Sequence, residues 1–284
     1  MFPYIFAKFF WDAYDYIGRL VLVNVISGFL MLAVAMVTMG IFYPIYAALG
    51  KSLLILAAGA GFFMILALPL PFSGMIHFLS RISEDKEPET RDFMEGVRKH
   101  YWPLIKGTAV FVILFEVLAV NIGFYITTDL LTGKLKFFTM IISGLCVWIF
   151  LYLAVMMLYA YPLLVPQGYI GIKKMLVRSF LLVMDNALVT IICVILLLGI
   201  WGLGIATKGV LIMVLNFALT ASLMNSMYVN VMEKYELREV TQQEKKEEGE
   251  KPASWKEIKT DEFIEDRHKR YKRSLRDILK PWEY

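Results

Sequence analysis

The sequence predicts an all-α polytopic membrane protein: a six-transmembrane-helix bundle with short cytoplasmic amphipathic helices and a soluble helical C-terminal tail. The first observation is composition, because 58% of the 284 residues are hydrophobic and 19% are charged. Soluble domains hold about 45–50% apolar and about 25% charged residues. The second observation is that the apolar residues gather into six long, almost uncharged stretches. The third is that the basic residues gather in alternate connections between them.

Each apolar stretch is long enough to cross a bilayer. A membrane helix needs about 20 apolar residues, and a charge at its centre is costly, so lysines and arginines bracket the predicted spans. Pro69 and Pro71 predict a kink or an early end in the second span. The predicted spans are 20–42, 52–78, 104–128, 137–164, 187–206 and 209–228.

An aromatic segment precedes the first span. Eight of the first sixteen residues are Phe, Tyr or Trp, and Lys8, Asp12 and Asp15 lie among them. This composition is typical of a segment that lies at the membrane interface. Because it lacks the basic start and the small-residue cleavage site of a signal peptide, we expect it to be retained.

The basic residues predict the orientation. All but four of the 29 lysines and arginines fall in the N-terminal segment, the connections after spans two and four, and the tail. Since cytoplasmic connections are enriched in Lys and Arg, both termini are predicted to be cytoplasmic, in a multi-pass protein of the cell (inner) membrane. The four on the opposite side are Lys51, Lys134, Lys136 and Lys208.

Two cytoplasmic connections carry helical apolar spacing. From Thr90, a candidate N-cap, Phe93, Val97 and Tyr101 recur about every four residues and lead through Pro103 into the third span. Ile172, Leu176 and Phe180 repeat the pattern beside Lys173, Lys174 and Arg178. Each segment is expected either to lie at the headgroups as an amphipathic helix or to be a plain basic loop.

The chain divides into a membrane domain over 1–233, a polar linker over 234–253 and a cytoplasmic basic amphipathic helix over 254–284. The Gln-rich and Glu/Lys-rich part of the linker, 241–251, is predicted to be flexible. The tail helix is expected to fold back on the protein, bind anionic headgroups or dock to a partner protein. Its candidate contact residues are Ile264, Arg270, Tyr271, Arg273, Leu275 and Ile278.

Glu116 is the one carboxylate near the middle of a predicted span. Such a group is expected to be neutral or paired and to face other helices. It is interpreted either as a proton- or cation-coupling site or as a protonated acid that joins helices. Its candidate hydrogen-bond partners are Asn24, Asn121, Asn216 and Asn225.

No pattern in the sequence indicates catalysis. HExxH, GxSxG, Walker A and metal-ligand spacings are missing, and Cys146 and Cys193 lie inside apolar runs. We therefore expect no enzyme activity, no cofactor and no metal. The net charge of +4 gives no reason to expect nucleic-acid binding.

Several stretches resemble the YesL-like family of bacterial integral membrane proteins of unknown function. They are 16–24 (YIGRLVLVN), 38–40 (TMG) and 90–99, which begins TRDF and ends RK. The resemblance covers most of 2–233 and implies a compact six-span domain, often encoded near genes for carbohydrate uptake and degradation. It carries no catalytic residues across.

Three kinds of function fit these patterns. The leading hypothesis is a non-enzymatic accessory or scaffold protein that meets a partner, such as transporter subunits, and is linked by the resemblance to carbohydrate uptake. The second is a small-solute transporter or channel subunit that uses Glu116. The third is a lipid-sensing module that uses the amphipathic segments and the tail.

Overall fold

The computed structural model describes residues 2–49, 53–84, 86–127, 134–167 and 170–247, and these residues form helices without a strand. The helices are α1 (Phe2–Asp15), α2 (Ile17–Ala48), α3 (Leu53–Ala67), α4 (Pro69–Ser83), α5 (Thr90–Thr127), α6 (Lys134–Gln167), α7 (Ile172–Asp185), α8 (Ala187–Ala206), the short π-helix η1 (Ile212–Asn216) and α9 (Phe217–Glu247).

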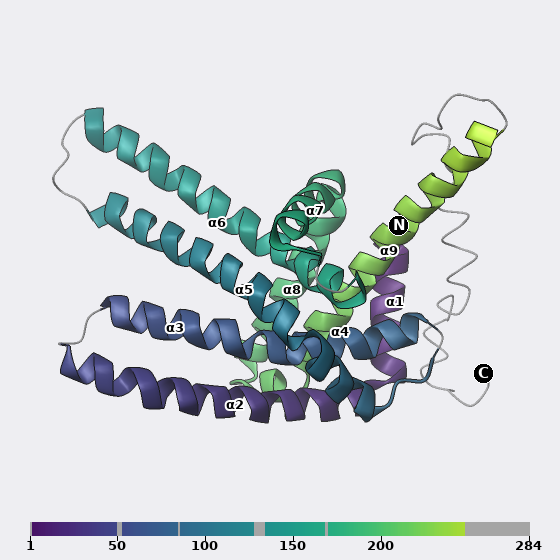
Figure 1. The fold of residues 1–284 in the computed structure, drawn as a ribbon, viewed down its shortest axis with the longest axis horizontal. Coiled ribbons are helices and arrows are strands. Elements are labelled where there is room, and N and C mark those ends of the chain that lie inside the picture. Colours follow the sequence, from purple (N-terminus) through teal and green to yellow (C-terminus); the bar gives the residue numbers. More distant parts are fainter. Residues whose placement is uncertain (1, 50–52, 85, 128–133, 168–169, 248–284) are drawn as a thin grey trace.

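Six helical segments are long and apolar enough to cross a membrane, which confirms the predicted all-α, six-span architecture. They correspond to α2, α3 with α4, α5, α6, α8, and η1 with α9. In Figure 1, α2 and α3 run side by side, as do α5 and α6. The second span changes helix at Leu68, directly before Pro69. Because proline lacks an N–H and fits the first turn of a helix, α4 begins there, as the two prolines predicted.

The two amphipathic segments differ. The segment after the fourth span is a separate helix, α7, which begins after Gly171 (φ +84°) and buries Met175, Ser179 and Leu182. The earlier segment is the first part of α5, which continues through Pro103 into the third span. Thr90 is not its cap: the Asp92 carboxylate accepts the backbone N–H of Glu89 at 2.7 Å. An acidic side chain at the third helical position caps the helix in this way.

The polar segment after the sixth span is helical as far as the structure describes it. The α9 helix continues through 241–247, where the sequence predicted a flexible linker. This prediction was wrong for those residues, because Glu, Lys and Gln all have high helix propensity and the bundle already nucleates the helix. The predicted tail helix, 254–284, lies outside the described residues.

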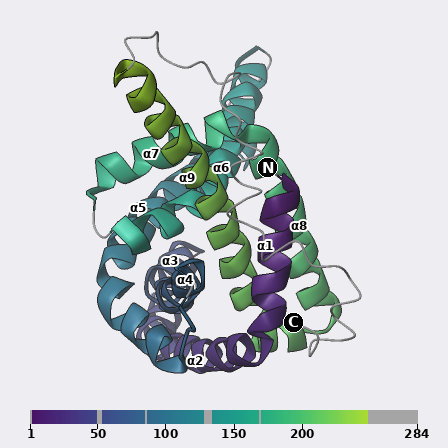
Figure 2. The same cartoon turned by 90° about the vertical axis from the view of Figure 1, so that its right-hand side faces the viewer.

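The sixth span is the most deeply buried of the six. In the most apolar window of that segment 67% of the residues are buried, whereas the other five spans bury at most 33% of theirs. Figure 2 shows α3 and α4 end-on, with α2, α5 and α9 around them. The remaining apolar surface faces outward, as in Met39 and Leu188, which are 71% and 79% exposed. Lipid is the solvent that such a surface requires.

Candidate intramembrane polar site

Of the five predicted polar residues, Asn24 makes the most hydrogen bonds to another span. Its side chain is fully buried in α2, and its amide Nδ2 donates to the carbonyl oxygens of Ile212 (3.1 Å) and Met213 (2.8 Å). Its Oδ1 accepts the backbone N–H of Ala218 at 2.9 Å. A π-helix has wider i→i+5 turns than an α-helix, and here its carbonyls accept a side chain. Asn24 therefore fastens the first span to the sixth at η1.

Asn216 lies at the other side of the same π-helix. Its Nδ2 donates to the carbonyl of Ile200 in α8 at 3.1 Å. The facing residue is Gly204, where a Cβ atom would overlap Asn216 and the side chain of Ile212. The glycine is required for this close approach between α8 and η1, as small residues are in other membrane helix contacts.

Glu116 does not join this site. It lies on α5 and faces Gly61 of α3, where a Cβ atom would collide with the Glu116 carboxyl group. Its Oε1 is buried and has no hydrogen-bond partner among the described residues. The structure thus places the carboxyl between two helices, as predicted, but away from the asparagines.

The other two predicted asparagines form hydrogen bonds elsewhere in the protein. Asn121 donates within its own helix to the Val117 carbonyl at 2.7 Å. Asn225 of α9 donates to the Ser83 hydroxyl of α4 at 3.4 Å. Of the five predicted polar residues, the structure therefore brings only Asn24 and Asn216 to one site.

Further hydrogen bonds between spans come from hydroxyl and indole groups that the sequence analysis missed. Thr108 of α5 bonds Tyr161 of α6 at 2.9 Å, and Tyr159 of α6 bonds Thr190 of α8 at 2.8 Å. Trp201 of α8 donates to Thr220 of α9 at 3.1 Å. These side chains are common in membrane spans, so only their pairing across helices identifies them.

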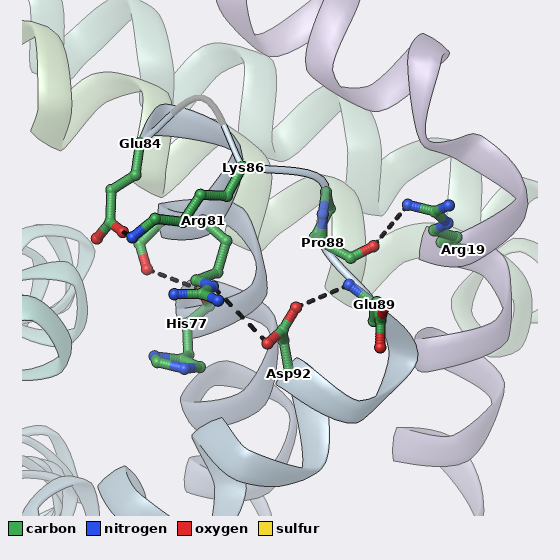
Figure 3. A network of polar contacts seen from close by, with 9 residues as sticks. Arg19, His77, Arg81, Glu84, Lys86, Pro88, Glu89 and Asp92 are labelled. Carbon is green, nitrogen blue, oxygen red and sulfur yellow. Dashed lines mark hydrogen bonds and ion pairs between the residues drawn. The ribbon is translucent and has the colours of Figure 1, made fainter.

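A second polar cluster lies where α4 meets α5, shown in Figure 3. Arg19 of α2 donates through Nη1 to the Pro88 carbonyl at 2.6 Å, and Arg81 forms an ion pair with Asp92 at 3.7 Å. The ring of His77 in α4 lies 5.2 Å from that of His100 in α5. This cluster anchors the connection between α4 and α5 to three helices.

The N-terminal aromatic segment is packed into the bundle on one side. The α1 helix contacts α9, and Lys8 and Asp12 form a buried ion pair at 2.8 Å with side chains 1% and 4% exposed. Buried charges require such pairing. The segment is therefore a structural helix of the bundle.

The described residues contain no group of three or more His, Cys, Asp or Glu side chains that could hold a metal ion. The predicted contact residues of the tail, among them Ile264, Arg270 and Leu275, lie outside the described part.

The fold and these contacts define an all-α, multi-pass membrane protein with hydrogen-bonded spans. Comparison with protein-family models, with curated proteins and with solved structures found no match to this chain. The resemblance to the YesL-like family accordingly stays a prediction.

Proposed function

We propose that this protein is a non-enzymatic accessory or scaffold component of the cell membrane that holds another membrane protein. The observation that supports this most is how its buried polar groups are used. Asn24, Asn216, Tyr159 and Tyr161 each hydrogen-bond another span. A transport path needs polar groups that remain available to a solute, whereas these groups are committed to holding the helices together.

The form of α9 supports a role at the cytoplasmic face. This helix extends beyond the bundle at the upper right of Figure 1. Val240 on that extension is 51% exposed, and Glu239 beside it is also exposed. An exposed apolar side chain among charges on a projecting helix suits contact with a partner helix or groove.

Transporter subunits are the partner class that we propose. The resemblance to the YesL-like family supports a link to carbohydrate uptake, by association alone. The lipid bilayer surrounds both this protein and the proposed transporter subunits.

Purification of the tagged full-length chain in a mild detergent tests this proposal. We expect the native chain and V210D to retain the same membrane protein at a fixed ratio, and V240D to lose it. Val210 is a matched control because it is 63% exposed and lies beside the turn between α8 and η1, away from the α9 extension. Retention of that protein by V240D, or no fixed-ratio protein with the native chain, would contradict the proposal.

A small-solute transporter or channel subunit is the alternative, and the Oε1 of Glu116 favours it because no described residue hydrogen-bonds this atom. A carboxyl oxygen that lies between two helices and accepts no hydrogen bond is available to a proton or a cation. Proton-coupled flux by the purified chain in liposomes, lost in a stably folded E116Q variant, would establish this alternative in place of the scaffold.

A further inference from the structure

A groove opens on the outer side of the bundle between α5, α6 and α7. Its volume is about 650 Å³, within the range of small-molecule sites. Apolar and aromatic side chains form its walls, among them Leu114, Trp148, Tyr152, Leu176, Val177 and Phe180. Trp148 is 74% exposed, so the groove is open to the surroundings of the bundle.

Side-chain contacts between α6 and α7 hold the two walls of the groove together. The Tyr152 hydroxyl donates to the Phe180 carbonyl at 3.1 Å, and the two rings lie 5.3 Å apart. On the inner face of α7, Met175 is buried in the core cluster. The α7 wall of the groove is thus held from both sides.

Positive charge lies at one end of this wall. Lys173 and Lys174 are both exposed and lie in the first turn of α7. Residues three and four apart share a helix face, so Lys173 lies one turn before Leu176 and Val177, and Lys174 one turn before Val177. Neither lysine lines the groove itself, but both lie one turn before the part of α7 that does.

A second groove lacks this charge. It lies between α2 and α3, has a volume of about 420 Å³ and is lined by residues such as Thr38, Phe42 and Phe63, with no charged side chain among its described lining. Both grooves suit hydrocarbon chains, and among the described residues it is the groove at α7 that has exposed lysines one turn from its wall.

We propose that the α5–α6–α7 groove binds one anionic glycerophospholipid, with an acyl chain along Trp148 and Phe180 and the phosphate at Lys173 and Lys174. Charge complementarity identifies the occupant, because ammonium groups beside a membrane attract anionic headgroups. The groove serves as a selective lipid site whether or not a protein partner binds the α9 extension.

Tryptophan quenching measures this site. The full-length chain is placed in phosphatidylcholine nanodiscs that contain increasing brominated phosphatidylglycerol, and the Trp148 signal is the difference between the native chain and W148F. We expect phosphatidylglycerol to quench Trp148 at a lower mole fraction than brominated phosphatidylcholine does. K173Q/K174Q should reduce this preference by about 25-fold, since each lysine near the surface contributes about a factor of five.

The control removes the same charge elsewhere. R98Q/K99Q alters two exposed basic residues of α5 and should keep the native preference. Equal quenching by the two lipids, or an unchanged preference in K173Q/K174Q, would reduce the site to ordinary surrounding lipid and overturn the proposal.

A second measurement tests the apolar part of the groove. V177F should narrow it without disturbing the core, because Val177 is 50% exposed. Native mass spectrometry should then find less retained phosphatidylglycerol on V177F than on L188F, whose site lies on α8 outside the groove. Equal retention by both variants would also overturn the proposal.

Discussion

At the scale of single residues, the same amide chemistry serves different ends. Asn24 satisfies three backbone groups of another span, whereas Asn121 satisfies one carbonyl of its own helix. The sequence ranks them equally, as polar residues inside apolar runs. What separates them is the number of buried groups that would lose a partner, because an unsatisfied buried donor or acceptor is more costly than a missing bond.

Replacing Asn24 by alanine should therefore lower the free energy of unfolding by about 1–3 kcal/mol. The Ala218 N–H and the carbonyls of Ile212 and Met213 would lose their side-chain partner in the bundle. Reversible unfolding of the purified protein in mixed micelles measures the change. N121A is the control and should stay within about 0.5 kcal/mol of native; a similar loss in both variants would contradict the role of Asn24.

At the scale of elements, the crossing of α4 and α5 depends on glycine. A Cβ atom at Gly96 of α5 would approach the Ser73 carbonyl of α4 to 2.9 Å and the Gly74 Cα atom to 3.1 Å. One turn earlier on α5, Phe93 fits against Gly74 in the same manner. Backbone atoms cannot move aside as a flexible side chain can, so this crossing admits no side chain at Gly96.

The variant G96A should destabilise the protein by about 1–3 kcal/mol through overpacking. G123A on the same helix should have the opposite sign, a gain of about 0.5–1 kcal/mol, since a Cβ there has open space and alanine is the better helix former. Thermal unfolding in detergent compares the two. A melting temperature for G96A equal to or above that of G123A would show that α4 and α5 can separate without cost.

At the scale of the whole molecule, six spans, an even number, place α1 and the end of α9 on the same side of the membrane. The cation distribution predicts that this side is the cytoplasm. The polar cluster of Arg19, Arg81 and Asp92 joins α2, α4 and α5 at that same end, while Lys208 lies in the turn between α8 and η1.

Cysteine accessibility in intact cells tests the orientation. In a C146S/C193S background, V210C should react with a membrane-impermeant maleimide, while K86C should react only after the cells are opened. Both sites are exposed, so the difference reports the side of the membrane. Labelling of K86C in intact cells with protection of V210C would reverse the predicted topology.

The sequence by itself determined the class and the spans of this protein. Charge-free runs such as 20–42 and 187–206 have no stable place outside lipid, and a span in lipid must satisfy its own backbone as a helix, so composition and length suffice. The break at Pro69 followed from equally local chemistry, whereas the spacing of Ile172, Leu176 and Phe180 was compatible with either an amphipathic helix or a basic loop. Glu116 was recognised as the unusual residue for the same reason.

Only the tertiary structure decided which polar groups meet. The bonds of Asn24 to η1 and to the start of α9 join residues 188 or more positions apart, and nothing in either segment alone encodes the partner. The pairing of His77 with His100, the burial of Lys8 with Asp12 and the groove beside α7 likewise arise from how helices pack. Packing depends on shape complementarity between distant surfaces, whereas membrane insertion depends on the composition of one segment at a time.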